Sequence, residues 1–188
     1  MAMDHFLEEV ASKKQSGVQT AALVLANIMM VVFALVAVML INMIISYVAQ
    51  YGFEVGLIYH IVLFLVTGGS AVLLFLKRDT IKTEYEYTFT NGTLDFAQVF
   101  NNKKRKALGT MNLKNIEACG KVSSGSFSRY ISKPGIKKSN WFVNREADLF
   151  YLYFNKENQP RIIIIEPQSE EMVNLIKGAV MPGVYQVN

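Results

Sequence analysis

Two long apolar runs dominate the first part of the chain. They cover residues 21–48 and 55–76, and Glu54 is the only residue from Ala21 to Leu76 that is charged at neutral pH. A transmembrane helix needs roughly 20 consecutive apolar residues, whereas a long helix of a soluble protein would show a polar stripe. The two runs therefore predict two membrane spans. The first is too long for the core of a cleaved signal peptide and leads directly into the second.

The connection between the two runs is so short that the chain must turn straight back, which predicts an antiparallel helical hairpin. Lys13 and Lys14 precede the first run, Lys77 and Arg78 follow the second, and the connection contains no Lys or Arg. The positive-inside rule then places both termini in the cytoplasm. We expect a multi-pass protein of the inner (plasma) membrane.

Small and polar residues inside the hairpin are candidates for helix packing. They are Asn27, Asn42, Gly68 and Gly69. Small residues let two helices approach closely, and an Asn side chain can hydrogen-bond across their interface. Packing within the hairpin is favoured over a transport site, because a transporter needs more helices around a midplane site.

The segment before the first run, residues 1–20, has a different pattern. Phe6, Leu7 and Val10 lie at helical spacing beside charged residues. This spacing predicts a short amphipathic helix on the inner membrane surface. A frayed, solvated lead-in is the alternative for so short a segment.

A change from continuous to alternating hydrophobicity near residue 80 marks a second domain, residues 80–181, followed by a tail over residues 182–188. Aromatic and polar side chains alternate over residues 83–90, and Asn91-Gly92 suits a type I′ turn into residues 93–100, which predicts a β-hairpin. Further strands are predicted over residues 107–111, 116–122, 127–131, 141–143, 149–154 and 161–166, the last two as a central hairpin. The tip of the turn over residues 101–106 is basic.

One helix closes this domain. Ser169 is its predicted N-cap, and Lys177 with Gly178 suits its end. Its apolar face contains Met172, Val173, Ile176 and Val180. Such a face needs a partner, which the open end of a curled sheet would supply.

About seven short antiparallel strands followed by one helix is the element order of a pleckstrin-homology-like (PH-like) barrel or sandwich. The segments YEYTFTNGTLDF, NKKRK, TMNLKNIE and IIIIEPQSEEMVNLIK occur in this order from residue 85 to residue 177. Through them the chain resembles bacterial PH-like membrane proteins, and more closely an uncharacterised two-span family of Gram-positive bacteria. The resemblance implies an α+β membrane protein with an anchored, non-catalytic domain.

Positive charge gathers after residue 76, with 17 Lys and Arg against 11 Asp and Glu. The candidate lipid- or partner-binding residues are Lys103, Lys104, Arg105 and Lys106 at the predicted hairpin tip, with Lys77 and Arg78 at the membrane exit. Each such residue near an anionic membrane contributes about 1 kcal/mol, so anionic lipid headgroups are a candidate partner. Solubility and edge protection are the alternative reason for a basic tip. Nucleic acid is disfavoured because aromatic residues do not interleave with these clusters.

The sequence contains no recognisable catalytic, metal or cofactor motif. One cysteine and two histidines are too few for a standard Cys/His zinc site. His5 and His60 both precede the domain that holds Cys119, so no histidine of that domain can activate the thiol. The segment around Lys121 lacks the spacing of a phosphate-binding loop. We expect no metal, no cofactor and no enzymatic activity.

These features predict a membrane-anchored interaction or scaffold protein that presents its PH-like domain to a protein partner or to copies of itself. The anchor raises the effective concentration of the domain at the bilayer. Two alternatives stay open at this point. One is an anionic-lipid-sensing module, and the other is an accessory subunit of a transporter or membrane enzyme.

Overall fold

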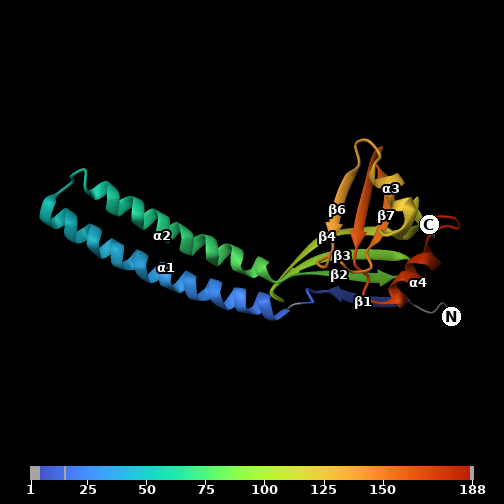
Figure 1. Cartoon of the computed structure of the whole chain (residues 1–188), viewed down its shortest axis with the longest axis horizontal. Coiled ribbons are helices and arrows are strands. Elements are labelled where there is room, and N and C mark those ends of the chain that lie inside the picture. Colours follow the sequence, from blue (N-terminus) through green and yellow to red (C-terminus); the bar gives the residue numbers. More distant parts are fainter. Residues whose placement is uncertain (1–4, 15, 187–188) are drawn as a thin grey trace. The chain divides into compact units, whose positions relative to one another are not determined.

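The computed structural model describes residues 5–14 and 16–186, which form two units. One unit is a helical hairpin that ends at Lys82. The other is a β-rich domain made of the residues up to Lys14 together with those from Thr83 onward. The hairpin is therefore inserted in the chain of the β domain, between its first and second strands (Figure 1).

The hairpin consists of α1 (Ser16–Tyr51) and α2 (Leu57–Lys77), followed by the short helix η1 (Arg78–Ile81). The two long helices run antiparallel (Figure 1), and the chain reverses where Gly52 adopts a φ of 74°. This positive φ is accessible to glycine without steric cost. The predicted helical hairpin is confirmed.

The outer surface of the hairpin is apolar. Leu35, Ile45 and Leu73 are each 61% exposed, and both helices are long and apolar enough to cross a membrane. Soluble proteins rarely expose apolar patches of this extent. The 36 residues of α1 rise about 54 Å at 1.5 Å per residue, more than the roughly 30 Å of a hydrocarbon core.

The two glycines expected to pack the hairpin lie in different surroundings. A Cβ atom at Gly68 would lie 3.9 Å from the Cβ of Ala37, so Gly68 faces α1, where Ala37 is buried. A Cβ atom at Gly69 would meet nothing within 4 Å. Of the pair, only Gly68 faces the other helix, and a Cβ there would make an ordinary van der Waals contact with Ala37.

The β domain contains two sheets among the described residues. The first has the antiparallel order β1-β2-β3-β4, with β1 (Phe6–Ala11), β2 (Thr83–Thr90), β3 (Thr93–Phe100) and β4 (Lys104–Asn112). The second has the order β6-β8-β7-β5-β9, with β5 (Ala118–Lys121), β6 (Lys137–Trp141), β7 (Phe150–Lys156), β8 (Gln159–Ile165) and β9 (Tyr185–Gln186). The helices of this domain are η2 (Leu113–Asn115), α3 (Gly125–Ile131) and α4 (Glu170–Ala179). The expectation is a barrel or sandwich of about seven strands; the sheets are not closed, so the barrel form is corrected to two open sheets.

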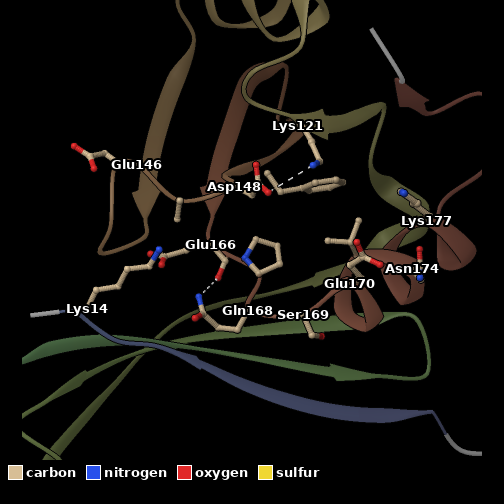
Figure 2. Close-up of a pocket in the computed structure, with 14 residues that line it drawn as sticks. Lys14, Lys121, Glu146, Asp148, Glu166, Gln168, Ser169, Glu170, Asn174 and Lys177 are labelled. Carbon is tan, nitrogen blue, oxygen red and sulfur yellow. Dashed lines mark hydrogen bonds and ion pairs between the residues drawn. The ribbon is translucent and has the colours of Figure 1, made fainter. Parts of the chain in front are cut away.

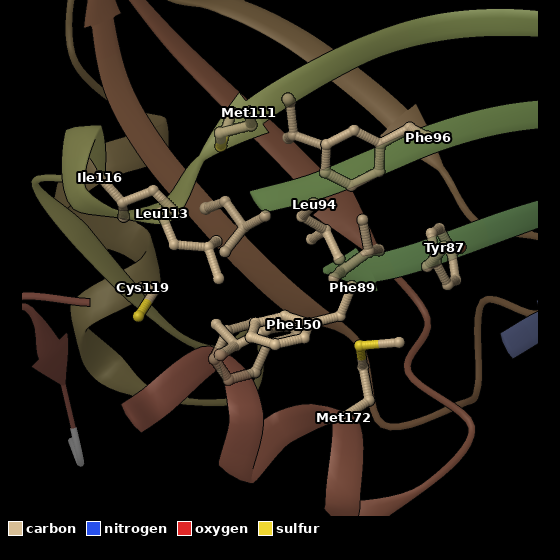
Figure 3. Close-up of a cluster of buried hydrophobic side chains, with 14 of the residues drawn as sticks. Tyr87, Phe89, Leu94, Phe96, Met111, Leu113, Ile116, Cys119, Phe150 and Met172 are labelled. Atoms are coloured by element: carbon tan, nitrogen blue, oxygen red, sulfur yellow. The ribbon is translucent and has the colours of Figure 1, made fainter. Parts of the chain in front are cut away.

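The main core lies between the two sheets and α4 (Figure 3). Tyr87 from β2 and Phe150 from β7 are buried there with Met172 and Ile176 of α4. The N-cap predicted for α4 is confirmed, because Ser169 Oγ accepts a hydrogen bond of 3.1 Å from the backbone N–H of Met172. The apolar face of this helix thus finds its partner in the open end of the sheets.

The helix expected before the first span is wrong for the residues that the structure describes there; residues 1–4 lie outside them. Phe6–Ala11 forms strand β1, which pairs with β2. Glu9 and Ala11 are buried while their neighbours Glu8 and Val10 are exposed. This alternation has the period of a strand.

A second correction concerns residues 127–131, which form part of helix α3 instead of a strand. Phe127, Tyr130 and Ile131 have the i, i+3, i+4 spacing of one helical face. They pack against a second buried cluster on β7 that includes Tyr151 and Tyr153. Phe150 and Leu152 belong to the main core, so β7 is buried on both faces.

The predicted tail is also corrected. Tyr185–Gln186 forms strand β9, parallel to Cys119 and Gly120 of β5; residues 187–188 lie outside the described part of the chain. The backbone N–H of Cys119 donates to the carbonyl of Val184 at 3.0 Å. The ordered domain therefore includes most of the segment expected to be a tail.

Replacement of Ile176 by Ala is expected to lower the free energy of unfolding of the β domain by about 2–5 kcal/mol, because it leaves a cavity in the main core. The chain has one tryptophan, Trp141, which packs against this core. Denaturant unfolding followed by its fluorescence reports on the β domain alone. Asn174→Ala, on the exposed side of the same helix, should change stability by less than about 0.5 kcal/mol; equal losses for the two variants would contradict this packing.

Candidate functional site

The basic cluster expected at a hairpin tip lies mostly on a strand. Only Lys103 is in the turn, and Lys104, Arg105 and Lys106 begin β4. Because side chains alternate along a strand, Arg105 points to the opposite face from Lys104 and Lys106. Arg105 forms an ion pair of 2.8 Å with Glu86. All four side chains are exposed, but they do not form a single basic face.

The basic residues at the end of the hairpin differ in their contacts. Lys77 ends α2 and is exposed. Arg78 Nη1 donates a hydrogen bond of 2.7 Å to Asn27 Oδ1, and its guanidinium lies 5.1 Å from the ring centroid of Phe75. Arg78 is therefore engaged inside the hairpin, where it joins the start of η1 to α1.

Asn42 does not take the cross-helix role expected of it. Its Nδ2 donates to the carbonyl of Val38 at 3.1 Å, one turn earlier on the same helix. The side chain is exposed on α1. Of the two asparagines, Asn27 forms a hydrogen bond between two elements of the hairpin, whereas Asn42 bonds only to its own helix.

Two carboxylates are buried in the β domain, with Glu9 8% and Glu166 2% exposed. Glu166 follows β8, and its carboxylate accepts hydrogen bonds from the backbone N–H groups of Val143 at 3.0 Å and Asn144 at 2.8 Å. Asn144 Nδ2 donates a third, at 2.7 Å. These three donors satisfy the carboxylate, which makes its burial tolerable.

Asn144 extends this network to the segment that precedes the hairpin. Its Nδ2 also donates to the carbonyl of Ser12 at 2.8 Å, and its Oδ1 accepts from the backbone N–H of Lys14 at 3.3 Å. On the other side, Glu9 accepts from the backbone N–H of Gln168 at 2.7 Å and from Ser169 Oγ. The residues around β1 are thereby bonded to the end of β8 and the start of α4.

A polar pocket of about 780 Å³ lies beside this network (Figure 2). Lys14, Lys121 and Lys177 line it together with acidic side chains, among them Asp148, which lies 3.7 Å from Lys121 Nζ. Glu166 also lines the pocket, but its oxygens already accept the three hydrogen bonds described above. The mixed charges give the pocket no net preference for an anion or a cation.

Two ionisable groups in the core are held neutral. Burial raises the pKa of the Cys119 thiol to about 12, and burial likewise raises the pKa of Tyr87. The Tyr87 hydroxyl donates to the carbonyl of Trp141 and accepts from the backbone N–H of Glu166 at 3.2 Å. Cys119 is fully buried and so is not available as a nucleophile in the folded domain.

A second, more apolar groove of about 380 Å³ lies where β4 of one sheet faces β6 and β8 of the other. Its apolar lining includes Phe96, Leu108, Trp141 and Phe154, and its basic lining residues are Lys137, Lys156 and Arg161. The Arg161 Nε atom is buried and has no hydrogen-bond partner among the described residues. We refer to this site as the β4–β6 groove.

The sequence pattern does not predict this groove or the burial of Glu9 and Glu166. The groove is assembled from the edges of two sheets, and no local pattern reports which edges meet. The burial of Glu166 has one weak indication in the sequence. It directly follows four isoleucines at the end of a strand predicted to lie in the central hairpin. In residues 5–14 and 16–186, no group of three or more His, Cys, Asp or Glu side chains is placed to hold a metal ion.

The profile of the family described as "Bacterial PH-like domain (DUF6106)" matches residues 3–186. The chain belongs to this family. The match includes the hairpin as well as both parts of the β domain, in agreement with the resemblance drawn from the sequence. No curated protein and no solved structure matches this bacterial PH-like protein.

Asn144→Ala is expected to lower the free energy of unfolding by about 1–3 kcal/mol, because it leaves buried partners without their hydrogen bonds. The measurement is denaturant unfolding followed by Trp141 fluorescence. The matched control is Asn140→Ala on β6, an exposed side chain, which should have little effect. A stability of Asn144→Ala equal to that of the control would show that the network contributes nothing.

The folded protein is expected to resist alkylation of Cys119 at pH 8. The raised pKa keeps the thiol protonated in the folded state, whereas in the unfolded chain it ionises near pH 8.5 and reacts as the thiolate. Mass spectrometry after iodoacetamide treatment should show modification only when denaturant is added. Above about pH 8.5 the thiol of the unfolded chain loses its proton while the thiol of the folded protein keeps it. The free energy of unfolding should therefore fall as the pH rises above this value. Rapid modification without denaturant would contradict the buried position.

Proposed function

We propose that this bacterial PH-like protein is a membrane-anchored, non-catalytic interaction module. The observation that carries the proposal is the insertion of an apolar helical hairpin between two paired strands of one domain. A hairpin with this exposed apolar surface is suited to lipid. The PH-like domain would then be tethered at both ends of the hairpin.

The chain connectivity supports one orientation. Ala11 of β1 pairs with Tyr85 of β2, so both ends of the hairpin lead into neighbouring strands and must emerge on the same side of a membrane. Lys13, Lys14 and Lys77 flank the hairpin on that side. The positive-inside rule makes this side the cytoplasm, so we propose a multi-pass inner-membrane protein with a cytoplasmic β domain.

A protein partner is favoured over a lipid headgroup as the ligand of the β domain. The open edges of the two sheets and the β4–β6 groove are features that a polypeptide can use. The basic cluster at the start of β4 is divided between two faces and partly neutralised by Glu86. Self-association of the domain and assembly with a larger membrane protein are both forms of this interaction.

Lipid sensing remains a second candidate, because Lys104 and Lys106 are both exposed on one face of β4. Amide hydrogen exchange of the full-length protein in nanodiscs tests it. Lipid sensing requires slower exchange over residues 103–106 when phosphatidylglycerol replaces phosphatidylcholine, with the effect lost at high salt. We expect unchanged exchange. The full chain is needed because a fragment from Thr80 onward would lack β1.

The anchor itself has a direct test. After alkaline carbonate extraction of cells that express the full chain, the protein should stay in the membrane pellet and require detergent for release. A control in which Val32, Leu35, Leu65 and Val66, all near the span centres and exposed, are replaced by Lys should lose this retention, because each cation at the centre of a span costs about 2.5–3.5 kcal/mol. Recovery of the unaltered chain in the soluble fraction would remove the proposal.

The interaction has a separate test in the same cells. Chemical cross-linking before detergent extraction should give a discrete higher-mass adduct that contains the full-length protein. Mass spectrometry of the adduct would distinguish a second copy of the chain from a different polypeptide. A chain that is retained in the membrane but never forms such an adduct would be an anchored domain without the proposed partner.

A further inference from the structure

We propose that the β4–β6 groove binds an extended, acidic segment of a partner protein, which adds as a strand to a free sheet edge. This inference rests on the proposed interaction function and names the site and the chemical class of its ligand. It is carried by three independent features of the groove: its strand edges, its apolar floor and its set of basic side chains, which includes an arginine with an unpartnered Nε.

The strand edges supply backbone hydrogen bonds. β4 is the last strand of the first sheet and β6 is the last strand of the second. Among residues 5–14 and 16–186, each therefore has one edge without a neighbouring strand of its sheet. An extended peptide can pair with such an edge through its main chain, independently of its sequence. Gly109 of β4 is exposed and has open space beside it, so a peptide can approach the backbone there.

The apolar floor supplies pockets for alternate side chains. The rings of Phe96 and Trp141 have centroids 4.8 Å apart, and Leu108 and Phe154 also line the groove. In an added strand, every second side chain would point to this floor. The remaining side chains would point outward, toward the rim.

The charges of the groove select acidic side chains. Its charged lining residues are Lys137, Lys156 and Arg161, all of them basic. The buried Nε of Arg161 has no acceptor among the described residues, and a buried donor without an acceptor is destabilising. The Nη2 atom of the same guanidinium is reachable and makes only a 3.5 Å contact with Gln159 Oε1, so a carboxylate of the ligand would accept a charge-assisted hydrogen bond there. The ligand is thus a strand in which acidic and apolar residues alternate.

A lipid headgroup could also supply an anion, but it would use only one of the three features. It offers no backbone N–H and C=O groups to the free edges and no alternating side chains to the floor. The polypeptide is therefore the occupant that the groove favours, and lipid binding is an outcome that the experiment can reveal.

The test uses full-length protein in a neutral detergent and the peptide EVEVEVE, acetylated and amidated at its ends. Trp141 is the only tryptophan of the chain and lines the groove, so its emission reports binding directly. We expect a saturable change in emission with EVEVEVE and none with the charge-reversed peptide KVKVKVK. Arg161→Gln should weaken binding roughly tenfold or more, as expected for the loss of a hydrogen bond between charged groups.

The controls separate the groove from general charge effects. Arg129→Gln removes the same charge from an exposed position on α3 and should leave the titration unchanged. If Arg161→Gln disturbs the fold, as judged by the Trp141 emission without peptide, the exposed Lys137→Gln variant replaces it, with the same direction of effect. Equal binding of both peptides, no saturable change, or unaltered affinity in the groove variant would overturn the proposal.

Vesicles of phosphatidylglycerol form the last arm of the test. A response of Trp141 to these vesicles, with no response to EVEVEVE, would overturn the peptide proposal in favour of lipid. A failure of the groove proposal can be distinguished from a failure of the proposed function. If only the groove proposal is wrong, a cross-linked adduct still forms in cells with the Arg161→Gln variant. If the proposed function is wrong, the unaltered chain itself fails the carbonate or cross-linking test.

Discussion

The pairing of β1 with β2 is the interaction on which the arrangement of this chain depends. Six residue pairs, from Phe6 with Thr90 to Ala11 with Tyr85, join segments that the whole hairpin separates. The hairpin holds its own two ends together, because Gln19 Nε2 donates to the carbonyl of Ile81 at 3.0 Å, so the pairing does not have to close a long flexible loop. The backbone ladder is reinforced by Glu9 and Asn144, whose hydrogen bonds reach the end of β8 and the start of α4. Without this pairing the first sheet would lose an outer strand, and the hairpin would be attached to the domain by one connection only.

The elements that were predictable from the sequence are those whose signals are local. The β2–β3 hairpin follows from alternation and from Asn91-Gly92, where both residues adopt positive φ. α4 follows from its cap and its apolar face. The errors occur where a short segment fits two periods: residues 6–10 fit a helix as well as a strand, and only pairing with β2 decides. The polar network and the β4–β6 groove lay beyond sequence reasoning, because they join residues from opposite ends of the chain or from the edges of two sheets. The same limit explains why the sequence indicates Asn27 as a packing residue but makes its partner, Arg78, a candidate for lipid or partner binding.

The open edges of the two sheets can bind a partner strand, but they can also promote aggregation. A free edge can pair with any extended chain and so promotes aggregation, and lysines along an edge reduce this risk. β4 begins with Lys104, Arg105 and Lys106, and β6 begins with Lys137 and Lys138. Charges that repel a second copy of the same edge would attract an acidic strand. If the proposed acidic strand binds there, the same residues would both discourage unwanted pairing and select the partner, whether or not they face a bilayer.

The insertion of the hairpin also fixes an order of events during synthesis. On the ribosome, Phe6–Ala11 emerges first, but its partner strand β2 follows only after both long helices have been translated. At about 5–20 residues per second, the roughly 74 residues from Ala11 to Tyr85 take about 4–15 s. Throughout that delay β1 has no strand to pair with, and the first sheet cannot be completed. Both long helices are therefore synthesised in full before the first sheet of the β domain can form.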